Sequence, residues 1–368
     1  MVIIGLMKNR SRIPNQPFFP LFEVAASDYF EQGLKIGKAA QRQIQLGLKR
    51  RKKWLKELED FSDQDPVGRF DVFLYLAHES FPQYLDELHG IAQGAEVPFH
   101  ILFILNLNPE LGAMMRLSRE EDCSTVLARV GDRLLLGHDE DGSEHYLGLM
   151  YLLRVKAPSG ISFLALSYPG IIHGNGPGIN SKGIVHTCNY LGGKKWRHGV
   201  PRYFIDRAML EARSMKEAIK FASHPGRAFS QAHNLISLWE KRAVMIEASV
   251  DKVSIKEVKG VVPRTNHFLL PPMKNEPQFS AYQKNSLPRF EALQAELKGI
   301  EPKKISPDQI VHALSSHQNR PVSPCRHKSP KVPGATLGTM LFDSAVPDLK
   351  FFFQMPCKNI FKKFPRPI

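Results

Sequence analysis

The feature that most constrains the fold is a change in hydrophobic pattern at Cys123. Before it, apolar residues recur at helical spacing over about 27–60, 70–93 and 99–115. After it, short apolar runs bounded by turn residues predict strands, mixed with a few helical stretches. Runs of strands and runs of helices without strict alternation are typical of an α+β domain with largely antiparallel sheets. The predicted strands are 124–130, 133–137, 151–155, 161–167, 183–189, 234–239, 243–248, 253–258, 336–342 and 349–354, and the later helices are 202–222, 280–297 and 307–315.

Charge divides the chain at the same place. Residues 1–122 hold 15 Lys and Arg against 17 Asp and Glu, whereas 123–368 hold 35 against 19, so the formal charge of +14 comes from the second part. A basic surface suits anionic substrates, the phosphates of an acyl carrier, nucleic acid or an anionic membrane; a solvated face is the plain alternative. No nucleic-acid-binding motif accompanies the charge, so we expect no nucleic-acid partner.

Several features bear on compartment and metals. No apolar run approaches the roughly 20 residues of a membrane span, and the apolar opening 1–7 precedes its basic residues, the reverse of a secretory signal. The four cysteines are widely spread, which argues against a disulfide framework and against zinc pairs of the C-x-x-C type. Cys325-Arg326-His327 offers only a C-x-H pair, which we assign to packing or a loop. We therefore expect a cytoplasmic protein with no transmembrane segment and no metal.

Cys123 has the sequence context of a nucleophile. A free cysteine is usually a small buried hydrophobe, but this one follows the polar segment 116–122, which is expected to be exposed, at the start of a strand. Cleavage there would give it a free α-amino group with a pKa of about 7.7–8.0, and one residue would then supply nucleophile and general base. A thiol protease with a histidine partner is the competing chemistry, but no flanking signature supports it.

The residues around Cys123 resemble a known family. Cys123-Ser124-Thr125, then Gly137-His138-Asp139-Glu140-Asp141 with Asp141 eighteen residues after the cysteine, is similar to the acyl-coenzyme A:6-aminopenicillanic acid acyltransferase-like peptidases. These are self-cleaving N-terminal-nucleophile hydrolases, similar in their catalytic part to choloylglycine hydrolases. The resemblance covers roughly 33–357. Its other motifs lie, in the family's order, at 87–95, 106–110, 178–183, 188–190, 264–268 and 286–290.

The resemblance implies a four-layer αββα fold in residues 123–368, the large subunit, with 1–122 as a mostly helical pro-segment or small subunit. Cys123 would attack the carbonyl of Asp122, and water would then separate the two chains, which would remain associated. The same thiolate would take an acyl group from a small-molecule amide, ester or thioester and pass it to water or an amine. No cofactor is implied; acyl-coenzyme A would be a substrate.

The resemblance also assigns site residues. Asp141 would hold the new amine near the thiol; Asn189 and Asn266 would donate N–H groups to the oxyanion; Arg289 would lower the thiol pKa. His138, Asp139 and His267 would support these groups. Each has a plain structural alternative: an Asp or Asn in a turn, an Arg on a helix surface, or a core histidine.

The chain also departs from the family. Relatives usually carry a small residue where Asp122 stands, and favour Asn and an aromatic residue where this chain has Asp139 and Gly142. A second hypothesis therefore stays open, in which the chain is an unprocessed relative that acts as a binding or scaffold protein, with 1–122 still covering the pocket.

Overall fold

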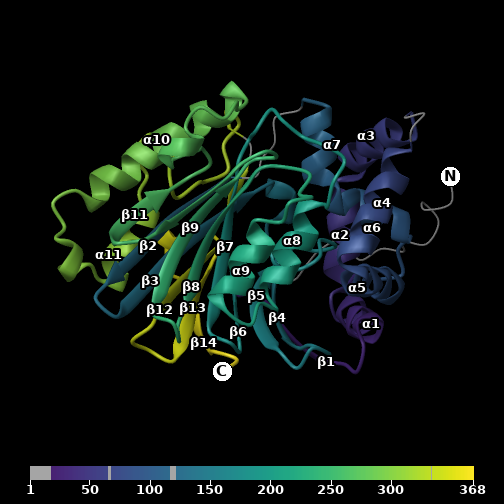
Figure 1. Ribbon diagram of the computed structural model, residues 1–368, viewed down its shortest axis with the longest axis horizontal. Coiled ribbons are helices and arrows are strands. Elements are labelled where there is room, and N and C mark those ends of the chain that lie inside the picture. The colour runs from purple at the N-terminus through teal and green to yellow at the C-terminus, as the bar shows by residue number, and fades with distance from the viewer. Residues whose placement is uncertain (1–17, 65–67, 117–121, 333) are drawn as a thin grey trace.

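The computed structural model describes residues 18–64, 68–116, 122–332 and 334–368. Two sheets dominate it (Figure 1). The larger, in spatial order, contains β1 (Leu21–Ala25), β4 (Tyr151–Lys156), β5 (Ser162–Ser167), β6 (Gly178–Asn180), β7 (Ile184–Tyr190), β8 (Gln231–Ser237), β9 (Arg242–Ala248) and β10 (Val253–Glu257). The smaller contains β11 (Gly260–Arg264), β2 (Asp122–Val130), β3 (Arg133–Gly142), β12 (Ala335–Asp343), β13 (Asp348–Phe353) and β14 (Phe361–Pro365).

Alternating side chains on β2 and β3 show how the layers stack. Leu127 and Leu136, opposite each other in the hairpin, belong to the large core that also contains Leu164 and Val185 of the other sheet. Because successive strand residues point to opposite faces, their neighbours Val126, Ala128 and Leu135 lie on the other side. There they form a second core with α10 (Ser280–Leu297) and α11 (Pro307–Leu314), while a third core joins the outer face of the large sheet to α8 (Arg202–Met209) and α9 (Met215–Ala222). The four-layer αββα prediction is confirmed.

The first part of the chain forms seven described helices at one side of the sheets (Figure 1). Each predicted helical stretch is broken into shorter helices. Pro82 and Pro109 lie in the first turns of new helices in the second and third stretches, because proline favours the first turn of a helix rather than its interior. The first stretch is broken at Ala40 and Arg51. The helices are α1 (Tyr29–Ala39), α2 (Gln41–Arg50), α3 (Lys52–Asp63), α4 (Arg69–Ser80), α5 (Pro82–Gly94), α6 (Phe99–Asn106) and α7 (Asn108–Met114).

Helices α1 and α5 approach so closely that their backbones touch. A Cβ added at Gly90 would lie 2.1 Å from the carbonyl oxygen of Phe30, and one added at Gly33 would lie 1.9 Å from that of Glu87. Gly37 and Gly94 meet the opposite helix in the same way. The pairing therefore requires glycine at these four positions.

We expect Gly90→Ala to lower the free energy of unfolding by about 3 kcal/mol, because the two helices must separate to admit the methyl group. Gly47→Ala in α2 is the matched control: the atoms nearest to its Cβ would belong to the side chains of Pro169, at 3.3 Å, and Leu149, at 3.9 Å, rather than to a helix backbone. The control should be neutral or stabilising by up to about 1 kcal/mol, since Ala favours helix. Denaturant unfolding monitored by circular dichroism measures both variants, and equal effects would contradict the close-packing explanation.

Strand β1 shows that the segment before Cys123 is not helical throughout. It pairs parallel with β4 and forms an edge of the large sheet. The sequence pattern also missed β6, β11 and β14; β11 contains Pro263, which an edge strand tolerates. The expectations for 1–7 and for 117–121 of the polar segment lie outside the described residues. No helix in the described part of the chain is long and apolar enough to cross a membrane.

Candidate active site

Cys123 is the second residue of β2 and is almost fully buried, with 4% of its surface exposed. It lies directly opposite Glu140 of β3 and on the same strand face as Leu127, so its side chain is directed between the two sheets. Burial, together with the negative charge of Glu140, raises the pKa of the thiol well above its ordinary value. In this form of the chain the sulfur is a protonated, enclosed thiol.

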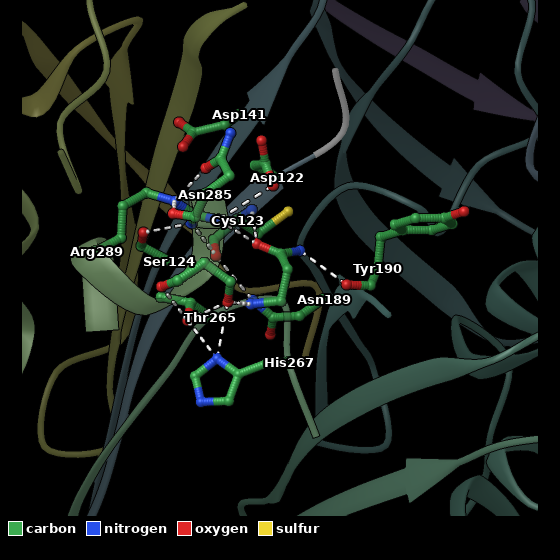
Figure 2. Close-up of polar contacts among 12 residues, drawn as sticks. Asp122, Cys123, Ser124, Asp141, Asn189, Tyr190, Thr265, His267, Asn285 and Arg289 are labelled. Carbon is green, nitrogen blue, oxygen red and sulfur yellow. Dashed lines mark hydrogen bonds and ion pairs between the residues drawn. The ribbon is translucent and has the colours of Figure 1, made fainter. Parts of the chain in front are cut away.

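The backbone of Cys123 is held by three of the residues that the resemblance singled out. Its N–H donates to Asn266 Oδ1 at 2.9 Å. Its carbonyl oxygen accepts from Arg289 Nη1 at 2.8 Å and from Asn189 Nδ2 at 3.2 Å. Figure 2 shows Arg289 on one side of this backbone, with the sulfur pointing away from it. The fold thus brings residues from β7, α10 and the segment after β11 to the backbone of one residue of β2.

The two asparagines contact the backbone of Cys123. The Asn266 amide nitrogen donates to the carbonyl oxygen of Tyr190 at 2.9 Å, and the Asn189 oxygen accepts from Thr125 and from Asn234. Their amide groups are therefore already engaged in hydrogen bonds, and their role as oxyanion donors stays a prediction.

Two buried arginines hold the carboxylate of Asp122. Arg289 Nη2 lies 3.1 Å from Asp122 Oδ1, and Arg326 Nη1 lies 2.7 Å from Oδ2. Asn285 joins the pair, because its side-chain oxygen accepts from both guanidinium groups. Arg289 is fully buried rather than on a helix surface. Sequence reasoning did not name Arg326 or Asn285 as site residues, and it assigned the segment that contains Arg326 to packing or a loop.

Asp141 lies directly opposite Asp122 in the hairpin. Its Oδ1 accepts from Thr336 at 2.6 Å, and its Oδ2 is buried without a hydrogen-bond partner among the described residues. Burial raises the pKa of this carboxyl to about 7, although Arg326 and Arg289 act in the opposite direction. It is therefore poised to exchange a proton near neutral pH.

The shifted pKa of Asp141 predicts a pH-dependent stability. The carboxyl ionises at about pH 7 in the folded chain and at about 3.9 in an unfolded one, so the unfolded state binds fewer protons between these values and stability falls as pH rises. In an uncut Cys123→Ala chain, adding Asp141→Asn keeps an acceptor for Thr336 and removes the charge. We expect Asp141→Asn to raise the free energy of unfolding more at pH 8 than at pH 5, by on the order of 2 kcal/mol. Urea unfolding at both pH values tests this, and a gain independent of pH would contradict it.

Glu140 is a site residue that sequence reasoning did not single out. Its Oε1 lies 3.8 Å from Cys123 Sγ and accepts from the Tyr168 hydroxyl at 2.6 Å. Its Oε2 lies 3.1 Å from His138 Nε2. The strand register could have indicated it, because strand pairing across the short turn places 140 opposite 123.

The contacts of His138 locate a proton. The single hydroxyl proton of Thr125 is donated to Asn189, so the Thr125 oxygen accepts from His138 Nδ1, 2.8 Å away. Since Nδ1 carries a proton, the Nε2···Glu140 contact needs a second proton, either on the imidazole or on the carboxyl. The thiol therefore adjoins a buried Glu–His pair that shares a proton.

The two remaining predicted residues lie behind the site. His267 Nδ1 lies 2.8 Å from the Ser286 hydroxyl, which accepts from the backbone N–H of Asn266 at 2.7 Å. Burial and nearby arginines lower the pKa of His267 to about 4, so it is neutral at pH 7 and orients Asn266 through Ser286. Asp139 accepts from Thr339 at 2.5 Å, and burial raises the pKa of this carboxyl well above its usual range.

Three clusters in the described chain bring together at least three side chains that could ligate a metal. Cys123, His138 and Glu140 form the first. Cys325 and His327 are a C-x-H pair in the sequence, and the fold adds His317 and Cys357 to them. The other clusters are His186, Asp206 and His233, and His317, Cys325, His327 and Cys357.

Comparisons with known proteins agree with the resemblance. A family model described as acyl-coenzyme A:6-aminopenicillanic acid acyl-transferase matches residues 128–357. The 40 kDa form of acyl-coenzyme A:6-aminopenicillanic-acid-acyltransferase from Emericella nidulans is 26% identical over 328 residues, covering 87% of this chain and 83% of that protein. A β-alanyl-dopamine/carcinine hydrolase from Drosophila melanogaster is 31% identical over 181 residues, which span 44% of this chain and only 47% of that relative. A mutant conjugated bile acid hydrolase from Clostridium perfringens superposes with a TM-score of 0.40 at 10% identity, covering 66% of this chain and 96% of that one.

Proposed function

Because this chain belongs to the acyl-coenzyme A:6-aminopenicillanic acid acyl-transferase family, we propose that it is a self-processing cysteine enzyme that transfers acyl groups to water or to an amine. Cys123 is its nucleophile, and cleavage between Asp122 and Cys123 activates it. One observation carries the proposal: Asn266, Arg289 and Asn189 are hydrogen-bonded to the backbone nitrogen and oxygen of Cys123 itself. Such contacts suit a residue whose own backbone takes part in the chemistry.

The first reaction is internal. The Cys123 thiol adds to the carbonyl carbon of Asp122, the carbon–nitrogen bond breaks, and the thiol proton ends on the released nitrogen. The Glu140 carboxyl group, 3.8 Å from the sulfur, relays that proton. Water then hydrolyses the thioester, which frees the Asp122 carboxyl group and restores the thiol. Only 4% of the Cys123 surface is exposed. In the uncut chain the thiol can therefore attack the carbonyl of its neighbour Asp122 but not an outside substrate.

The second reaction uses the new amine. Asn266 Oδ1, which already accepts from the Cys123 nitrogen at 2.9 Å, holds the amine beside the thiol, and the half-free Asp141 carboxyl lies across the hairpin from it. The buried positive charges of Arg289 and Arg326 disfavour a protonated amine nearby. Both effects favour a neutral amine that accepts the thiol proton when substrate is attacked.

The two cleaved chains remain associated in this proposal. Strand β1 pairs with β4 along five residues, and a buried ion pair joins Glu87 of α5 to Arg207 of α8 at 2.8 Å. Glu110 of α7 also accepts from the backbone N–H of Arg202 at 2.7 Å. These contacts do not depend on the 122–123 bond, so cleavage leaves them in place.

The substrate is an acyl compound whose acyl group rests on Cys123 as a thioester. One relative is named as a hydrolase and another as an acyltransferase with acyl-coenzyme A, so the proposal includes both water and amines as acceptors. Acyl-coenzyme A is a candidate donor, and the basic second part of the chain, with 35 Lys and Arg against 19 Asp and Glu, suits its phosphates.

Intact-mass spectrometry of the purified full-length protein tests the proposal. We expect two chains of 122 and 246 residues and, after a brief incubation with an acyl-coenzyme A or an N-acyl amine and an acid quench, an acyl adduct on the longer chain. A single 41.6 kDa chain with no adduct after long incubation would favour the alternative, a binding or scaffold protein. The ion pairs that hold Asp122 in place are the observation that favours this alternative.

A further inference from the structure

Two histidines and two cysteines from three separate segments converge at one end of the six-stranded sheet. His317 follows α11, Cys325 and His327 precede β12, and Cys357 lies in the short helix η4 (Pro356–Lys358) between β13 and β14. We propose that these four side chains bind a structural Zn²⁺ ion. This site is separate from the proposed acyl chemistry and does not depend on it.

The donor atoms lie at distances that suit one tetrahedral ion. His317 Nε2 and His327 Nε2 are 3.0 Å apart, while His327 Nε2 lies 3.7 Å from Cys325 Sγ and 3.3 Å from Cys357 Sγ. All four donor atoms fall within 4.8 Å of one another. With Zn–N near 2.0 Å and Zn–S near 2.3 Å, the edges of a tetrahedron are about 3.3–3.8 Å. Adjustments of a few tenths of an ångström would close most of these contacts on one ion.

The donor set favours zinc over other cations. Two imidazole nitrogens and two thiolates are the ligands of many structural zinc sites, and tetrahedral S₂N₂ geometry selects against Mg²⁺ and Ca²⁺. Two thiolates neutralise the ion, so no further carboxylate is required. The imidazole rings meet at 66° with centroids 4.9 Å apart, so the rings are not stacked and their Nε2 atoms face each other.

Burial differs across the cluster in a way that suits metal entry. Cys325 is fully buried, the two histidines are partly buried, and Cys357 is exposed. A cation can therefore reach the site from the side of Cys357 and be closed in by the other three ligands. Four protein ligands leave no open position, which is the arrangement of a structural rather than a catalytic ion.

The ion would hold Arg326, a residue of the candidate active site, in position. Cys325 and His327 flank Arg326, whose guanidinium lies 2.7 Å from the Asp122 carboxylate. The backbone N–H of Arg326 also donates to Thr336, which in turn donates to Asp141. Zinc ligation on both sides of Arg326 would hold this segment against β12 and the nucleophile strand.

The number of zinc ions bound per chain tests the proposal. The test uses full-length Cys123→Ala protein without a histidine tag, which also removes the thiol of the Cys123 cluster. After dialysis against Zn²⁺ and removal of the excess, elemental analysis should find about one zinc per chain. The zinc content of the Cys357→Ser variant should be lower by about tenfold or more. His312→Gln, an exposed histidine of α11 outside the cluster, is the matched control and should keep its zinc.

Cobalt provides a second readout that does not depend on retention during dialysis. Co²⁺ added to the chelator-treated protein should give the visible absorption of a tetrahedral thiolate complex, absent in Cys357→Ser and in His327→Asn. Circular dichroism identifies any variant that has failed to fold. Zinc below 0.1 per chain with no cobalt spectrum, equal zinc in Cys357→Ser, or a disulfide between Cys325 and Cys357 in peptide maps would each overturn the proposal.

Discussion

Cys123→Ala is expected to remain one 41.6 kDa chain under conditions in which the unsubstituted protein separates into chains of 122 and 246 residues. The substitution removes the only atom that the proposed nitrogen-to-sulfur shift uses as nucleophile, so cleavage should fall on the order of 10⁶-fold, as it does when other nucleophilic enzymes lose theirs. Denaturing gels and intact-mass spectra taken over days measure the loss. Acyl transfer should be lost with it.

Cys188→Ala is the matched control for that experiment. Cys188 is another buried cysteine, on β7 of the facing sheet, and its sulfur contacts the backbone oxygen of Asn175 rather than the 122–123 peptide. We expect this variant to be cut normally. If Cys123→Ala is cut at the same bond and rate as the unsubstituted chain, an outside protease is responsible and the self-processing mechanism is wrong.

Arg289→Met is expected to cost about 3 kcal/mol in the free energy of unfolding, measured by denaturant in the uncut Cys123→Ala chain. The fully buried guanidinium donates to the Cys123 carbonyl oxygen, to Asn266 and to Asp122. Its loss removes one hydrogen bond from the Cys123 oxygen and one from Asn266 Oδ1, which keep Asn189 and the Cys123 N–H as donors. It also leaves the buried Asp122 carboxylate with Arg326 as its remaining partner among the described arginines, and losing part of the pairing of a buried charge costs several kcal/mol.

Two further variants separate the charge from the geometry at this position. Arg289→Lys keeps the charge but cannot bridge several acceptors with one planar group, so its cost should fall between that of Arg289→Met and zero. Arg213→Met, at an exposed arginine, should stay within about 0.5 kcal/mol. A cost below 1 kcal/mol for Arg289→Met would mean that Arg326 alone satisfies Asp122 and that Arg289 is not needed to hold the carboxylate.

Strand pattern predicted much of the site's framework. The apolar runs on either side of Gly131-Asp132 predicted the β2–β3 hairpin, and its register brings Asp141 and Glu140 opposite Asp122 and Cys123. Strand β11 was missed because Pro263 and the short length of the strand hide its pattern, although an edge strand tolerates proline. Asn189, Asn266 and Arg289 were named through the family resemblance, and the fold places all three on the Cys123 backbone.

Contacts between residues that are far apart in the sequence could not be predicted from a local pattern of this kind. Arg326 lies in a segment without periodicity that the sequence analysis assigned to packing or a loop, yet it reaches the site because β12 pairs with β3. The same segment lies next to Cys357 and His317 in the folded chain, which the local sequence does not indicate. A short C-x-H pair therefore concealed both a partner of Asp122 and half of a four-residue cluster.

The sequence placed Cys123 at the start of a strand, and because strand side chains alternate, Asp122 and Cys123 must lie on opposite faces of that strand. Only the tertiary structure decided that the Cys123 face meets the other sheet and the Asp122 face meets α10. The partners of Asp122 came from the three-dimensional arrangement, since Arg289 and Arg326 stand 167 and 204 residues away along the chain. A buried carboxylate must find opposite charge wherever the packing of distant elements supplies it. The local sequence around Asp122 therefore indicates that a positive partner is required if the carboxylate is buried, but not which residues provide it.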